Sequence, residues 1–173
     1  MGDRGTWSEI VRDSYVMSNT ALAGVKVLEF ATMVSGPYCG KLLGDMGAEV
    51  VKVELPVGDP SRAAGPFPEG GSDPEKSALY LYNNTSKRSL VLDPGEPDQQ
   101  EPFEDLIAWC DVLIDNHSPR ILEAAGLDWQ ALQVINPRLI YTVITPYGLS
   151  GPREHVPGDE LTLIHAGGLG NLL

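Results

Sequence analysis

Residues 22–54 limit the possible folds of this chain more than any other stretch, because two short apolar segments there flank one helical pattern. The segments VKVLEF (25–30) and EVVKVE (49–54) have the composition of strands covered on both faces. The loop after the first strand lies at its carboxyl end, where open α/β sheets place their ligands. Between the strands, apolar residues recur every four positions, as on one face of a helix: Tyr38, Leu42 and Met46.

The rest of the chain continues the alternation of strands and helices. Residues 56–76 are rich in Pro and Gly, which predicts a long segment without a regular element. We therefore expect an α/β fold with a Rossmann-like, mainly parallel sheet and helices on both faces. A flexible leader is expected at 1–21, before an ordered domain at 22–173. Further strands are predicted at 87–93, 111–116 and 139–148, and helices at 77–84, 102–109, 118–126 and 128–136.

Composition excludes several classes of partner. The chain has 42% apolar and 21% charged residues, as a folded globular protein does. Its net charge of −12 argues against nucleic acid or an anionic membrane surface as a partner. No apolar run approaches the roughly 20 residues of a membrane span, and the N-terminus lacks the apolar core of a signal peptide. We expect a cytoplasmic protein in which Cys39 and Cys110 are reduced thiols.

Two clusters near predicted strand ends are candidates for ligand binding. In the segment SGPY (35–38), a glycine at a strand-to-helix turn would let a ligand approach the backbone, although taken alone a tight turn is the favoured explanation. In KRS (87–89), Lys87 and Arg88 could meet a phosphate, but strand-edge cations more often serve solubility.

The segment DNHSPR (115–120) follows a predicted strand and begins a predicted helix. Ser118 suits the N-cap, and Arg120 in the first turn would be explained by an anionic ligand or by ordinary exposure. His117, like the other histidines, lacks a metal-like spacing with cysteine, and we expect no metal site. In PGDE (157–160), the pattern predicts an N-cap aspartate followed by a first-turn glutamate.

In this order, the segments resemble the class III CoA-transferase family (CaiB/BaiF type), which also includes α-methylacyl-CoA racemases. The resemblance extends from residue 22 to about residue 168 and rests on many ordered matches, of which no single one would be specific. The matching segments are LAGVKVLEF, SGPYCGKLLGDMGAEVVKVE, GDPSR, GPF, TSKRSLVLD, CDVLIDNHSP, LEAAGLDW, INPRLIY, YGLSGP and PGDE.

The resemblance implies a protein that moves CoA between an acyl-CoA and a carboxylic acid. In family transferases an aspartate attacks the acyl-CoA carbonyl to form a mixed anhydride, and the CoA thiolate returns to give an enzyme thioester. The acceptor acid then collects the CoA. A carboxylate becomes a useful nucleophile when a dry site holds the acyl-CoA beside it.

Positions that bind CoA in the family carry over residue by residue. Asn116, His117 and Ser118 match a segment in which the family usually has an aromatic residue and a cation, so His117 replaces the aromatic residue and Ser118 the cation. Arg120 is a possible substitute for that cation. The resemblance implies the following CoA-binding residues: Val34, Ser35, Leu92, Asp93, Asn116, His117, Ser118, Pro157, Gly158, Asp159 and Glu160.

The resemblance places no catalytic nucleophile among residues 1–173, because the aspartate of the family lies beyond this stretch. Glu160 matches an acidic residue beside the active centre and is an auxiliary candidate. Asp159 stands where racemases carry histidine, which counts against racemase chemistry. We expect an N-terminal CoA-binding fragment that is inactive alone. The alternative is a non-catalytic domain that binds CoA or pairs within a larger or two-chain protein. Family members are interlocked homodimers, so a second copy or a partner chain is expected.

Overall fold

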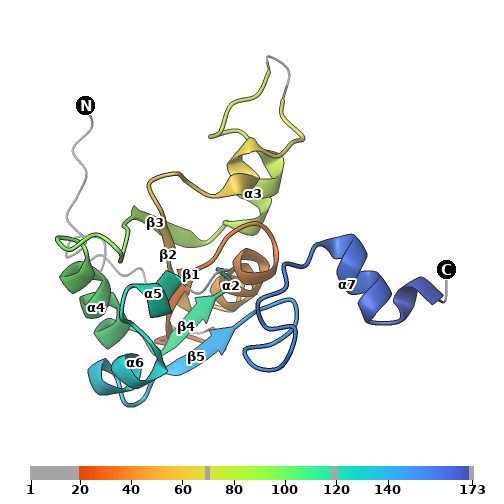
Figure 1. Cartoon of the computed structure of the whole chain (residues 1–173). Helices are drawn as coiled ribbons and strands as arrows, with labels where there is room; N and C mark the ends of the chain where they lie inside the picture. The colour runs from red at the N-terminus through yellow and green to blue at the C-terminus, as the bar shows by residue number, and fades with distance from the viewer. Residues whose placement is uncertain (1–19, 69–70, 118–120, 172–173) are drawn as a thin grey trace.

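The computed structural model describes residues 20–68, 71–117 and 121–171, and its centre is a parallel five-stranded sheet (Figure 1). The strand order is β3-β2-β1-β4-β5, with β1 in the middle. This confirms the predicted α/β fold. The strands are β1 (Lys26–Phe30), β2 (Glu49–Glu54), β3 (Lys87–Val91), β4 (Val112–Asp115) and β5 (Ile140–Val143).

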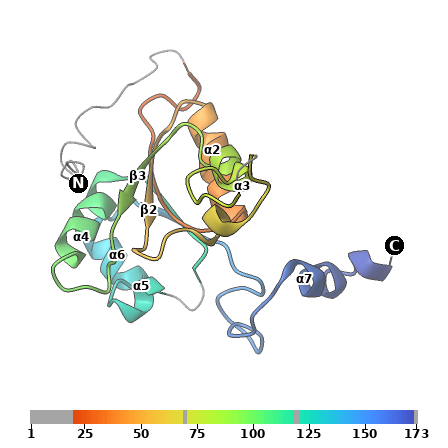
Figure 2. The same cartoon turned by 90° about the horizontal axis from the view of Figure 1, so that it is seen from above.

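Helices cover both faces of the sheet, as predicted (Figure 2). The α-helices are α2 (Ser35–Asp45), α3 (Ala78–Asn83), α4 (Gln100–Trp109), α5 (Ile121–Ala124), α6 (Trp129–Ile135) and α7 (Glu160–Ala166). Short 3₁₀ turns are η1 (Pro60–Ala63) and η2 (Leu169–Asn171). In the described part of the chain, none of the helices is both long and apolar enough to cross a membrane.

Two details of the predicted elements are wrong. Residues 56–76 were expected to hold no regular element, but Asp59 accepts a hydrogen bond from the N–H of Ser61 and begins η1. The last strand ends at Val143 instead of continuing to residue 148, because Pro146 lacks an N–H and Gly148 has a φ of 89°. The predicted start of a helix at Ser118 lies outside the described residues.

The two faces of β1 differ in chemistry. Leu28 and Phe30 point into a large apolar cluster formed with α4 and α6. On the opposite face, under α2, Val27 is apolar but Glu29 is charged and fully buried. In the middle of β1, one face therefore packs in an apolar cluster, and the other changes from apolar at Val27 to charged at Glu29.

Helix α2 turns its smallest residues toward this second face. Gly36, Pro37 and Gly40 are buried. A Cβ atom on Gly40 would lie 1.9 Å from Oε2 of Glu29, so glycine at this position makes room for the carboxylate. The apolar residues with helical spacing predict the helix correctly, but in the structure they are 41–45% exposed: Tyr38, Leu42 and Met46.

After β5, the chain leaves the carboxyl edge of the sheet and α7 projects away from it (Figures 1 and 2). Asp159 is the N-cap of α7, as predicted, and its carboxylate accepts a hydrogen bond from the N–H of Thr162 at 2.8 Å. The Oγ1 of Thr162 accepts from the N–H of Asp159 in return, which completes a capping box. No side chain of α7 is buried.

Candidate functional site

Asn116, directly after β4, joins this strand to the loop that follows β1. Its Oδ1 accepts the N–H of Thr32 at 2.8 Å, and its Nδ2 donates to the C=O of Thr32 at 2.8 Å and to Oγ of Ser35 at 3.0 Å. The carboxyl ends of parallel neighbours meet at one edge of the sheet, and β1 pairs directly with β4. The structure thus brings together Ser35 and Asn116, two of the residues predicted to bind CoA.

His117 is held against β1 and is mostly buried. Its Nδ1 lies 3.0 Å from the C=O of Phe30, and its ring lies 4.1 Å from the ring of Phe30 between centroids. The side chain is 8% exposed. The Oδ1 of Asp115 accepts the N–H of His117, while Oδ2 accepts the hydroxyl of Tyr141. The histidine ring therefore stacks on the protein's own phenylalanine. Ser118 lies outside the described residues.

The start of α2 is open to solvent beside this junction. Val34 is the N-cap and is 47% exposed, and its side chain makes no capping hydrogen bond. Ser35 is also exposed. Gly36 is buried, and a Cβ atom there would lie 2.3 Å from Cβ of Ala31. Gly36 therefore permits close packing of α2 on the β1 loop, a role that neither of the two sequence interpretations of this glycine included.

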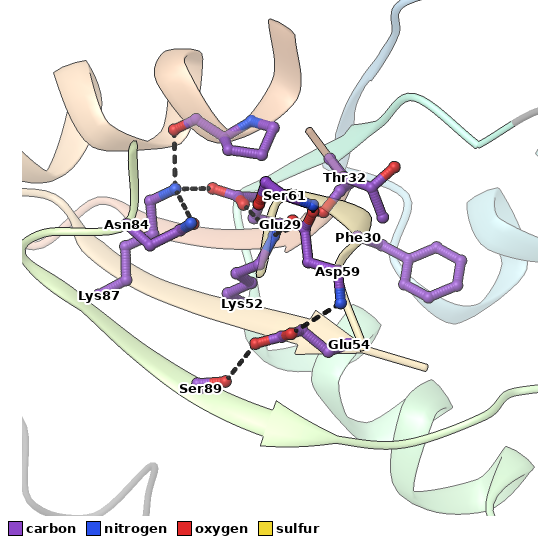
Figure 3. Close-up of polar contacts among 12 residues, drawn as sticks. Glu29, Phe30, Thr32, Lys52, Glu54, Asp59, Ser61, Asn84, Lys87 and Ser89 are labelled. Carbon is purple, nitrogen blue, oxygen red and sulfur yellow. Dashed lines mark hydrogen bonds and ion pairs between the residues drawn. The ribbon is translucent and has the colours of Figure 1, made fainter. Parts of the chain in front are cut away.

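Lys87 and Arg88, on β3, form ion pairs with carboxylates of β1 and β2, respectively. Lys87 is 2% exposed and lies 2.7 Å from Oε2 of Glu29 (Figure 3). Burial lowers the pKa of Lys87, and the charge of Glu29 opposes this effect. Arg88 pairs with Glu49. These contacts agree with neither a free phosphate-binding pair nor a solubilising strand edge.

The GDPSR segment is fixed to the end of β2 by a second ionic group. Arg62 donates from Nε to Oε2 of Glu54 at 2.8 Å and from a terminal nitrogen to Oε1 at 2.9 Å. The hydroxyl of Tyr80 donates to the same carboxylate at 2.6 Å. Burial raises the pKa of Glu54, but these hydrogen bonds and the charge of Arg62 outweigh it and lower the pKa to about 2.

The remaining predicted site residues lie farther along the same edge of the sheet. Leu92 is buried in the α4-side cluster, and Asp93 accepts the N–H of Gly95 in a turn, both after β3. Gly158 packs closely on Pro146, beyond the end of β5. The neighbouring Pro157, Asp159 and Glu160 are exposed. Ser35 and Asn116 are the pair of described site residues, distant in sequence, that a hydrogen bond joins.

The comparison with known families assigns the chain. The model for CoA-transferase family III matches residues 22–172. The chain belongs to CoA-transferase family III. It spans little more than a third of the length of the curated relatives described next.

Two relatives and one solved structure illustrate the similarity. The succinyl-CoA–L-malate CoA-transferase beta subunit of Chloroflexus aurantiacus is 38% identical over 151 residues, covering 87% of this chain and 36% of that protein. Human succinyl-CoA:glutarate CoA-transferase is 37% identical over 170 residues, covering 97% and 37%. A CaiB/BaiF family protein from Brucella suis has a TM-score of 0.78 and 38% identity, covering 87% of this chain and 40% of that chain.

Three charged residues beneath the loop between β1 and α2 were not predicted from the sequence: Glu29, Lys52 and Asp59. A signal was present, because Glu29 and Lys52 interrupt otherwise apolar strands. Buried charges need partners, but sequence alone does not name them. Among the described residues, no group of three or more His, Cys, Asp and Glu side chains is arranged to hold a metal ion. Cys39 is a half-buried free thiol and Cys110 a buried one.

Proposed function

We propose that this chain is the amino-terminal, CoA-binding part of an enzyme that moves CoA between an acyl-CoA and a carboxylic acid. One observation carries the proposal: in a chain of CoA-transferase family III, Asn116 fixes the loop that presents Val34 and Ser35 at the open end of α2. The N–H groups at the start of a helix favour negative charge, which suits the phosphates of CoA. The relatives that are named CoA-transferases support the same activity.

In the proposed reaction, a carboxylate attacks the carbonyl carbon of the acyl-CoA and the carbon–sulfur bond breaks, which leaves a mixed anhydride and CoA thiolate. The resemblance places this nucleophilic aspartate after residue 173. Residues 22–173 would contribute binding and orientation of CoA. We therefore expect residues 1–173 alone to bind CoA and to transfer none. The proposed setting is the cytoplasm.

Calorimetry with CoA tests the binding part of the proposal. We expect Val34→Asp to weaken binding, because it places a negative charge beside the phosphates at the start of α2. Val134→Asp adds the same charge on α6, where Val134 is 84% exposed, and should leave binding unchanged. An exchange assay with acyl-CoA and a carboxylic acid tests the other part. Turnover by the 173-residue chain would contradict it.

A second candidate is a non-catalytic domain that pairs with another copy or with a partner chain. The exposed apolar side of α2 favours it, since Tyr38, Leu42 and Met46 form a continuous stripe at helical spacing. Analytical ultracentrifugation together with calorimetry separates the two candidates. Association without any heat from millimolar CoA would favour pairing over CoA binding.

A further inference from the structure

The loop between β1 and α2 is also held from the side of β2. Lys52, on β2, donates to the C=O of Ala31 at 2.6 Å. Asp59, in the loop after β2, accepts the N–H of Met33 at 3.0 Å. Asn116, after β4, bonds to Thr32 of the same loop, so side chains from β2, from the loop after it and from the end of β4 all hold this loop.

The ammonium group of Lys52 contacts three partners. The side chain of Lys52 is 1% exposed, and its ammonium nitrogen lies 3.1 Å from Oε1 of Glu29 and 3.0 Å from Oδ2 of Asp59, in addition to the C=O of Ala31. Two of its three donors have hydrogen-bond acceptors, Oε1 of Glu29 and the C=O of Ala31, while Asp59 forms an ion pair with it. A buried ion group of this kind is stable only while all its partners stay in place.

Asp59 is fixed just as firmly. Besides Met33, its Oδ1 accepts the N–H of Ser61 at 2.8 Å, and its own N–H donates to Oε2 of Glu54 at 3.1 Å. Burial raises the pKa of Asp59, but the charge of Lys52 and the N–H groups of Met33 and Ser61 outweigh it and keep the pKa below its ordinary value. At neutral pH the side chain is therefore a carboxylate.

The residue that Asp59 holds has an unfavourable backbone conformation. Met33 has a φ of 63°, a region that non-glycine residues enter at an energetic cost. It directly precedes Val34, the exposed N-cap of α2. Such a conformation persists only when its surroundings enforce it, and Asp59 supplies the hydrogen bond to this residue.

We infer that Asp59, oriented by Lys52, is a positioning residue that fixes the loop at residues 31–35 in the conformation that receives CoA. The inference rests on the proposed function. Asp59 contacts Met33 by hydrogen bonding and acts on the ligand only through the loop. The role in CoA binding therefore belongs to the GDPSR segment as well as to the loop itself.

Asp59→Asn tests the inference, because it keeps the shape of the side chain and removes its charge. The amide either directs its NH₂ group at the ammonium of Lys52 or turns it toward the N–H of Met33, so one hydrogen bond is lost. Asp73→Asn is the matched control. Asp73 accepts the N–H of Glu75, two residues later, and pairs with Lys76, so these contacts stay within its own turn.

Hydrogen–deuterium exchange of the ligand-free protein gives the first readout. For Asp59→Asn we expect the amides of residues 31–35 to exchange about tenfold faster, as loss of one hydrogen bond predicts. Peptides from β4 and α4 should be unchanged, and Asp73→Asn should match the wild type. Calorimetry gives the second readout, with CoA affinity about tenfold weaker for Asp59→Asn only. If that variant does not fold, Asp59→Ser replaces it, because serine can still cap η1.

Unchanged amide exchange of residues 31–35 in Asp59→Asn would overturn the inference, whatever the CoA affinity of that variant. Faster exchange with unchanged CoA affinity would overturn the functional role of Asp59 and leave the proposed function standing. If the wild type itself binds no CoA, the proposed function fails and the positioning role fails with it, while the exchange data still report whether Asp59 orders the loop.

Discussion

The side-chain amide of Asn116 bonds to both backbone polar groups of Thr32, although 84 positions separate the two residues. The last paired residues of β1 and β4 are Phe30 and Asp115. Beyond them, the amide of Asn116 takes the place of a strand backbone and extends the pairing into the loop. The loop that carries Val34 and Ser35 is thus tied to the sheet after the sheet itself has ended.

Asn116→Asp should lower the free energy of unfolding by about 2 kcal/mol, because the variant keeps the acceptor for Thr32 but turns the donor into a second acceptor that faces a carbonyl. Urea denaturation measures the effect. Gln133→Glu, at an exposed position of α6, makes the same chemical change and should be nearly neutral. Equal unfolding midpoints for Asn116→Asp and the wild type would contradict a stabilising role of this amide.

Gly40→Ala should destabilise the protein by about 1–3 kcal/mol despite the higher helix propensity of alanine, because its Cβ atom would collide with the buried carboxylate of Glu29. Gly44→Ala in the same helix is the comparison. Its nearest neighbour would be the C=O of Ser86 at 3.1 Å, so a smaller loss is expected. Thermal denaturation of both variants tests this order, and a more stable Gly40→Ala would refute it.

Stability should fall steeply in acid because of Glu54. Its pKa is lowered from 4.5 to about 2, so the folded state favours the carboxylate. The stabilisation is fully present above the unfolded pKa of 4.5 and is lost as the pH falls from there to about 2. Urea unfolding at several pH values should show a loss on the order of 2 kcal/mol over this window. In Glu54→Gln the free energy of unfolding should fall less steeply as the pH decreases. An unchanged pH dependence would exclude Glu54 as its source.

Lys87→Met should cost about 3 kcal/mol of stability, since it leaves one oxygen of the buried Glu29 without its cation. The double variant Glu29→Gln, Lys87→Met retains the neutral pair of Lys52 and Asp59 and should lose less than the two single variants together. A double-mutant cycle from denaturation data measures this coupling, expected to be at least about 1 kcal/mol. Additive losses would show that Glu29 and Lys87 act independently.

Most of the sheet could be predicted because its strands are short, largely apolar segments that alternate with helical patterns. The predicted range 49–54 agrees with β2, and 87–93 and 111–116 contain β3 and β4. The outward face of α2 could not be predicted in the same way. Apolar spacing indicates a helix, whereas the buried side of α2 is decided by Gly36 and Gly40, whose small size lets the helix approach the sheet.

The candidate site could be predicted in part. Val34, Ser35 and Asn116 follow the ends of parallel strands, so a shared edge is a physical expectation, and the structure brings Ser35 and Asn116 together. The support beneath the loop could not be predicted. Which cation meets Glu29 depends on strand order and register, and Lys52 and Lys87 reach it from two different strands.

The four buried charges at positions 29, 52, 59 and 87 cancel, with two carboxylates facing two ammonium groups. A substitution that alters one of them leaves an uncompensated charge in the interior, so natural sequence change must replace a whole pair or none. Across CoA-transferase family III, these positions are therefore expected to covary, even though no two of them are adjacent in the chain. An engineer who redesigns the face of the sheet beneath α2 would have to change the four positions together.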